Sequence, residues 1–179
     1  MKIIDADGHI LDKEKELRAY LPESYRRRGG SLVPSLGVDA RLGGRFSDIE
    51  CHDVPTRLRD MDREGIDVSV LFPTTSFAMS KIFERDYAVA YARAYNDFIA
   101  EVCKESPRLK AVALLPFQDV EAAVKEVTRA VTKLIGWCRR GSSGNERASG
   151  IANVLAHLRR NTTAQCSFLC ARPARGAGR

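Results

Sequence analysis

The sequence has no uninterrupted apolar stretch of about 18 residues, so we expect no helix that spans a membrane and no membrane partner. It also lacks the apolar core of a signal peptide at its start, because acidic residues already occur within residues 1–7. With both features missing, we expect a cytoplasmic protein. Reducing conditions in that compartment argue against disulfide bonds among the five cysteines.

Nucleotide-binding glycine motifs are missing as well. The glycine pairs at 29–30 and 43–44 match neither a phosphate-binding Walker loop nor the fingerprint of a dinucleotide-binding fold. Zinc-finger spacing is also absent, because Cys166 and Cys170 have no second close pair of ligands to join them. We therefore interpret the glycines as loop residues and the cysteines as incidental.

Negative charge is almost missing from the end of the chain. Residues 136–179 contain eight Arg, no Lys and one acid, Glu146, whereas residues 1–135 contain 21 basic and 22 acidic residues. The net charge of +6 therefore comes from the tail. The body has no basic excess and argues against a nucleic-acid partner. Nucleic-acid binding through the tail is kept as a lower-ranked alternative function.

What the chain does have is an alternation of apolar runs and amphipathic stretches over residues 1–135, ahead of an irregular Arg-rich tail at 136–179. Asp53 and Asp119 stand where a helix cap is expected. The expected elements are a strand at 2–8, a short helical segment at 12–20, a long loop at 21–50, a helix at 53–65, a strand at 66–73, a helix from 80 to about 106, a strand at 109–116 and a helix at 119–131. The apolar stripe of the longest helix consists of Phe83, Tyr87, Ala90, Tyr91, Ala94, Phe98 and Val102. This alternation predicts an α/β fold with three parallel strands covered by helices.

The sharpest chemical pattern lies at the end of the first expected strand, in Asp5, Asp7 and His9. Alternate residues of a strand point the same way, so all three side chains are expected on one face. A carboxylate and an imidazole two residues apart can bind one divalent metal. The other interpretation is that the two aspartates order a turn at Gly8 while His9 is an ordinary surface histidine.

Residues 4–10, Ile-Asp-Ala-Asp-Gly-His-Ile, resemble the first strand of the amidohydrolase-related family, which includes aminocarboxymuconate semialdehyde decarboxylase. Its members commonly begin Ile-Asp-x-His-x-His, where both histidines bind metal; Asp7 and His9 occupy those two positions. The segments at 70–74, 91–98, 108–116 and 119–131 resemble the family's second strand, the helix after it, the third strand and its helix, in the same order.

The resemblance implies a metal-dependent hydrolase or decarboxylase that acts on a small carboxylated or cyclic substrate. It implies the N-terminal part of a (β/α)8 barrel, a fold of about 250 residues, of which this chain holds three strands. Asp7 and His9 are the expected ligands of a divalent metal, zinc in preference to manganese. Pro73, Thr74 and Thr75 are expected to contact the substrate. No catalytic residue is assigned, and a homo-oligomer is the expected assembly.

Later strands of the family complete the metal site, and a catalytic zinc normally takes three protein ligands. An inactive barrel fragment is therefore the alternative to an enzyme. His52 and His157 match no family motif. Reading the chain from Ile135 one nucleotide later, assuming an ATT codon there, restores the family's next strand, so we hypothesise a frameshift near residue 134 and a tail that is read out of frame.

Overall fold

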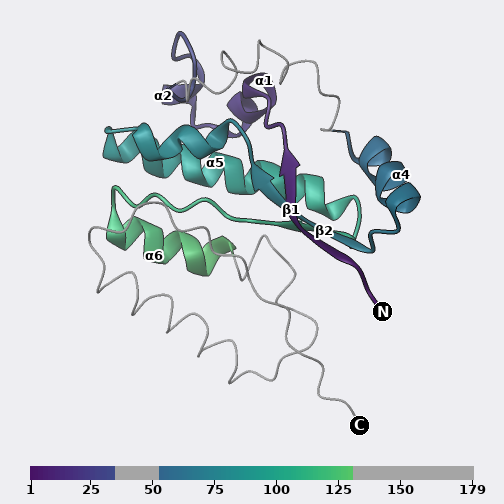
Figure 1. Ribbon diagram of the computed structural model, residues 1–179. Coiled ribbons are helices and arrows are strands. Elements are labelled where there is room, and N and C mark those ends of the chain that lie inside the picture. Colours follow the sequence, from purple (N-terminus) through teal and green to yellow (C-terminus); the bar gives the residue numbers. More distant parts are fainter. Residues whose placement is uncertain (35–52, 131–179) are drawn as a thin grey trace.

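The computed structural model describes residues 1–34 and 53–130, and its centre is a sheet of three parallel strands (Figure 1). The strands β1 (Ile4–Ile10), β2 (Val68–Pro73) and β3 (Leu109–Ala111) lie in the order β1-β2-β3. Both pairings are parallel. The described part is thus three successive strands of an incomplete (β/α)8 barrel, as expected.

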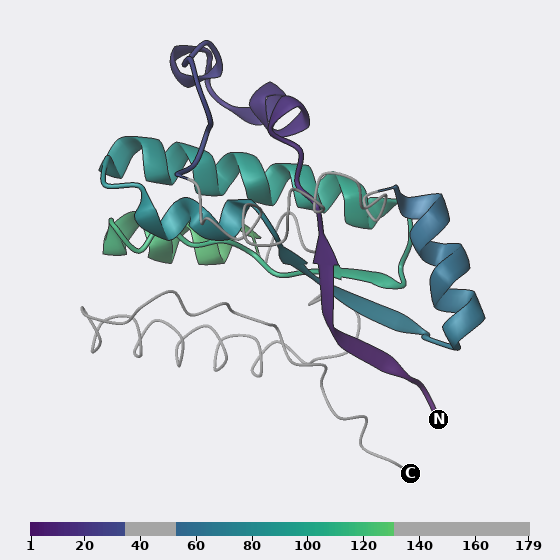
Figure 2. The same cartoon turned by 45° about the horizontal axis from the view of Figure 1, so that its top comes forward.

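The longest of the described helices, α5, lies between the sheet and the short helices that follow β1 (Figures 1 and 2). The helical elements are α1 (Glu14–Leu17), η1 (Arg18–Tyr20), α2 (Glu23–Arg26), α4 (Val54–Glu64), η3 (Ser76–Lys81), α5 (Arg85–Lys104) and α6 (Val120–Arg129). Within residues 1–34 and 53–130, no helix combines the length and apolar character needed to cross a bilayer.

The core lies where α5 packs against the sheet. Tyr91, Tyr95 and Ile99 of α5 are fully buried, as are Ile10 of β1 and Leu71 of β2. One expectation for this helix is wrong: α5 begins at Arg85 and not at Ser80, which belongs to η3. The Gln118 side chain donates to the carbonyl oxygens of Met79 and Ile82 and so holds η3 apart from α5. Phe83 therefore lies between the two helices, 96% exposed and outside the core.

Both expected helix caps are confirmed. The Asp53 carboxylate accepts from the backbone N–H of Thr56 at the start of α4, and that of Asp119 accepts from Ala122 at the start of α6. At the other end of α4, Gly65 has φ 70°, the left-handed conformation that glycine adopts most easily.

The third strand is shorter than the expected 109–116. The strand ends at Ala111, although Val112 N–H still donates to Leu71 O. Both backbone groups of Leu114 bond to the Asn96 side chain, with Leu114 N to Asn96 Oδ1 at 2.8 Å and Asn96 Nδ2 to Leu114 O at 2.9 Å. The Asn96 amide of α5 thus makes the two backbone hydrogen bonds of Leu114 that a neighbouring strand would otherwise make.

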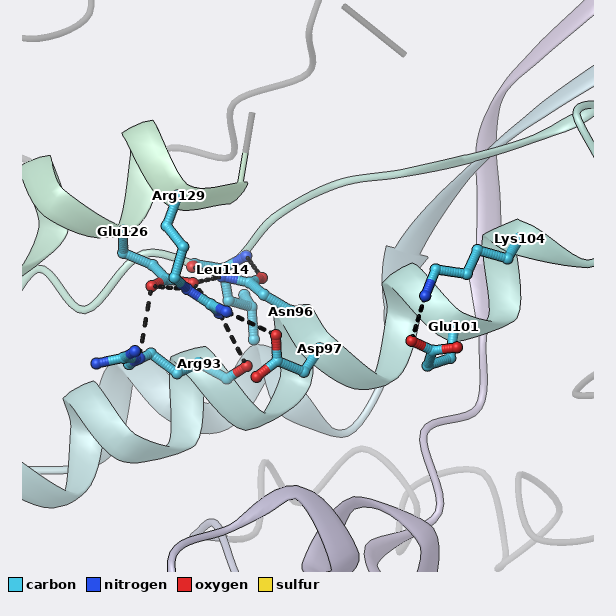
Figure 3. Close-up of polar contacts among 8 residues, drawn as sticks. All are labelled: Arg93, Asn96, Asp97, Glu101, Lys104, Leu114, Glu126 and Arg129. Carbon is cyan, nitrogen blue, oxygen red and sulfur yellow. Dashed lines mark hydrogen bonds and ion pairs between the residues drawn. The ribbon is translucent and has the colours of Figure 1, made fainter. Parts of the chain in front are cut away.

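The same amide begins a polar cluster that joins α5 to α6 (Figure 3). Asn96 Nδ2 donates to Glu126 Oε1 at 2.7 Å, and Arg129 donates to both Glu126 and Asp97. Asn96 and Glu126 are buried. Each buried polar group of these two side chains has a hydrogen-bond partner. The cluster can therefore fix the position of α6 on α5 without leaving a buried polar group unsatisfied.

Several expectations concern residues outside the described ranges. These are the tail domain at 136–179 with its reading-frame hypothesis, the clustered cysteines, His52, His157 and the later part of the long loop. They stay predictions.

Candidate metal site at the end of the first strand

Asp7 and His9 lie together at the carboxyl end of β1. Asp7 Oδ1 and His9 Nε2 are 4.0 Å apart, and the two side chains are 94% and 53% exposed. The two groups therefore share one face, on the end of the sheet where β/α barrels place their chemistry.

Asp5 does not join them, which corrects the expectation that all three side chains face one way. The register of β1 against β2 shifts between Asp5 and Gly8, so that one extra residue is inserted into β1. Asp5 Oδ2 accepts from Ser69 Oγ at 2.8 Å, and a Cβ on Gly8 would meet these same two groups. Asp5 and Gly8 thus share a face that His9, the next residue, turns away from. A glycine inside an expected strand was the available signal for this bulge.

The pair fits a divalent metal. Two ligand atoms about 2.1 Å from one ion at a tetrahedral angle are about 3.4 Å apart. The observed 4.0 Å needs only a small closure of two exposed side chains. Carboxylate oxygen and imidazole nitrogen are both ligands that zinc and manganese accept.

His9 is held from three directions. Its Nδ1 lies 3.3 Å from Thr74 Oγ1, in the segment after β2. Its ring lies 6.1 Å from the Phe72 ring, measured between centroids. Its carbonyl oxygen accepts from the guanidinium of Arg57 on α4. Sequence reasoning missed Arg57, since nothing in α4 indicates a contact with β1.

A buried carboxylate organises the segment after β2. Asp12 Oδ1 accepts from the N–H groups of Thr74 and Thr75, both at 3.0 Å, and Oδ2 accepts from Ser76 N–H at 2.7 Å. The Ser76 hydroxyl donates to Oδ2 as well and lies 2.7 Å from Tyr91 OH. Burial raises the pKa of Asp12 above its ordinary value, although these hydrogen bonds oppose the rise. Sequence reasoning missed this role, because an aspartate before a helix indicates a cap and not a long-range contact.

The three expected substrate-contacting residues lie next to one another but differ in exposure. Pro73 is fully buried, Thr75 is exposed, and Thr74 is partly exposed with its hydroxyl at His9. Of the three, Thr74 is the one that lies against the Asp7–His9 pair. Substrate contact by these residues stays a prediction.

No group of three His, Cys, Asp or Glu side chains that could hold a metal occurs within residues 1–34 and 53–130. Cys103 is no substitute ligand or nucleophile, because burial raises the pKa of its thiol to about 12. Metal binding by Asp7 and His9 stays a prediction.

The described residues thus form three parallel strands, each followed by helices, with an acid–imidazole pair at the end of the first strand. A scan of the chain against protein-family models finds no match.

Comparison with curated proteins identifies the relatives of this part. The chain is 38% identical over 115 residues to γ-resorcylate decarboxylase of Rhodococcus jostii, a match that covers 64% of this chain and 33% of that protein. It is 30% identical over 138 residues to 2-amino-3-carboxymuconate-6-semialdehyde decarboxylase of Dictyostelium discoideum, covering 73% of this chain and 37% of that one. The chain is homologous to the N-terminal portion of these decarboxylases and spans about a third of their length.

A solved structure shows the same fold. Dihydroxybenzoic acid decarboxylase from Polaromonas, with bound manganese and the inhibitor 2-nitroresorcinol, superposes with a TM-score of 0.51 at 27% identity. The match covers 75% of this chain and 36% of that one. Since that relative holds manganese, the expected preference for zinc has no support from it.

Proposed function

We propose that this chain supplies the first metal-binding strand of a decarboxylase that acts on a small aromatic carboxylate. The observation that carries the proposal is the juxtaposition of Asp7 and His9, 4.0 Å apart at the carboxyl end of β1. The homologous decarboxylases support the reaction type, and they favour decarboxylation over the hydrolysis that the resemblance also allowed.

In this proposal Asp7 contributes a carboxylate oxygen and His9 contributes Nε2 as ligands. The bound metal would act as a Lewis acid toward oxygen atoms of the substrate. Thr74 lies beside His9 and would contact the substrate. Decarboxylation breaks the bond between a ring carbon and the carboxyl carbon; CO2 leaves, and a proton takes its place on the ring.

A second candidate is a barrel fragment without enzymatic activity. It is favoured by the finding that residues 1–34 and 53–130 hold no group of three His, Cys, Asp or Glu side chains that could bind a metal, whereas a catalytic metal usually takes three ligands from the protein.

The test uses the full chain, stripped of metal and titrated with Mn²⁺ and, separately, with Zn²⁺. Asp7→Asn and His9→Gln are expected to weaken binding at least about 10-fold. Asp60→Asn, which removes an exposed carboxylate of α4 paired with Arg63, is the matched control and should bind as the unaltered chain does.

Release of CO2 from γ-resorcylate is then measured with the metal-loaded chain. Metal-dependent release that both site variants abolish supports the decarboxylase. Metal binding without any release supports the inactive fragment, and a chain that binds neither metal contradicts the proposal.

A further inference from the structure

The contact between His9 and Thr74 joins the carboxyl ends of two neighbouring strands. His9 is the penultimate residue of β1, and Thr74 directly follows β2. His9 Nδ1 and Thr74 Oγ1 are 3.3 Å apart, so the hydroxyl engages the ring nitrogen that does not face Asp7. The other nitrogen, Nε2, is left on the side of the Asp7 carboxylate.

A hydroxyl is suited to this place whichever nitrogen carries the proton. It can accept from Nδ1–H when Nε2 is bare and ready to bind a metal, and it can donate to Nδ1 when Nε2 is protonated. The contact therefore restrains the orientation of the ring in both forms of neutral imidazole.

Thr74 is itself fixed at its backbone. Its N–H donates to the buried Asp12 carboxylate at 3.0 Å, and the next two residues donate to the same carboxylate. Asp12 also fixes Ser76, whose hydroxyl contacts Tyr91 in the core. The Thr74 hydroxyl is thus presented from a segment anchored to the core and not from a free loop.

The rest of His9 is restrained as well. Its carbonyl oxygen bonds to Arg57, and the Phe72 ring lies against one side of the imidazole. With the backbone held, the remaining freedom is rotation of a half-exposed ring about its side-chain torsions. Turning the ring over about its Cβ–Cγ bond would place Cδ2 beside Thr74 and Cε1 on the side of Asp7 where Nε2 now lies.

We propose that Thr74 is the positioning residue of the metal site: its hydroxyl holds the His9 ring so that Nε2 faces Asp7, and Asp12 holds Thr74. This inference rests on the proposed function for the role of the metal. The ring contact itself is independent of any metal.

The first measurement follows ring mobility in the metal-free full chain. Carbon-13 relaxation at His9 Cδ2, assigned by its loss in His9→Gln, gives an order parameter for the ring. Thr74→Val keeps the shape of the side chain but removes the hydroxyl, so the order parameter should fall. Thr74→Ser restores the hydroxyl and should restore the order parameter. An unchanged value in Thr74→Val, or no recovery in Thr74→Ser, overturns the inference.

The second measurement is the affinity for Mn²⁺. Removal of a group that orients a metal ligand typically weakens binding by about 10–100-fold, which is the loss expected in Thr74→Val with recovery in Thr74→Ser. Equal affinities in all three proteins overturn the positioning role. If the unaltered chain binds no Mn²⁺, the proposed function fails, while the order parameters still decide whether Thr74 holds the ring.

Discussion

At the scale of single residues, Gly8 lies where β1 passes close to Ser69 and Val70 of β2. A Cβ there would be 2.3 Å from Ser69 Oγ and 2.9 Å from the carbonyl oxygen of Val70, and the second of these is backbone that cannot swing aside. The bulge before Gly8 turns this position toward Asp5 and Ser69. Glycine is therefore required by close approach, and the orientation of His9 depends on it.

Gly8→Ala is expected to lower the free energy of unfolding by about 3 kcal/mol or more, because both neighbours would have to shift. Gly29→Ala is the control, since nothing lies within 4 Å of its added methyl group, and it should change stability by less than about 0.5 kcal/mol. Urea unfolding followed by circular dichroism measures both. Equal stability of the two variants would show that β1 and β2 are not packed as described.

The residue scale also shows where sequence reasoning succeeds. Asp7 and His9 could be paired from spacing alone, since side chains two apart in a strand share a face. Asp5 could not be excluded in the same way, because a bulge reverses that alternation and only Gly8 indicated it. Asp12 could not be found at all. Its partners follow β2 and are more than 60 residues away along the chain.

At the scale of elements, α5 and α6 are joined through the buried amide of Asn96. Its three hydrogen bonds satisfy both backbone groups of Leu114 and one oxygen of Glu126. No local pattern indicates this role, since a sequence-based interpretation of α5 finds its apolar stripe and treats an asparagine as a surface residue. The same bonds account for the early end of β3.

Asn96→Leu is expected to destabilise the fold by about 3–5 kcal/mol, because it leaves both buried backbone groups of Leu114 without their partner and removes one of the donors to the buried Glu126 carboxylate. Glu101→Gln is the control on the same helix. It removes an exposed pair with Lys104 (Figure 3) and should cost less than about 0.5 kcal/mol. Thermal and urea unfolding of the two variants measure the difference. Similar losses in both would mean that the Asn96 cluster does not fasten α6.

Some helix boundaries could be predicted from the sequence and others could not. Those of α4 were predictable because Asp53 and Gly65 act locally, through a cap and a left-handed glycine. The start of α5 was not, because η3 is held by Gln118, a residue beyond β3. Local chemistry can be derived from sequence, whereas a boundary fixed by a distant side chain cannot.

At the scale of the whole molecule, the described sheet has two edge strands, β1 and β3. Within residues 1–34 and 53–130, β1 and β3 each pair with a single neighbour, β2. Strand edges and uncovered apolar groups such as Ile3 and Ile4, both about half exposed, favour pairing with further chains. The homo-oligomer expected from the sequence stays a prediction, and the edge of β1 is the place to look for it.

Association through that edge predicts a molecular mass that rises with protein concentration, measured by light scattering. Ile4→Lys places a charge on the edge and should lower the association. Phe83→Ser removes the most exposed aromatic side chain among residues 1–34 and 53–130, at a place far from β1 in the sequence, and serves as the comparison. A mass that Phe83→Ser lowers and Ile4→Lys leaves unchanged would assign association to a different surface.

The central claim, that Asp7 and His9 bind one metal ion, is tested most directly by pulsed electron paramagnetic resonance of the Mn²⁺-loaded full chain, grown with ¹⁵N-labelled histidine. The sequence has three histidines, so each can be replaced in turn. The account predicts a hyperfine coupling from a histidine nitrogen that disappears in His9→Gln and persists in His52→Gln and His157→Gln. A coupling that survives in His9→Gln, or none in the unaltered chain, would contradict it.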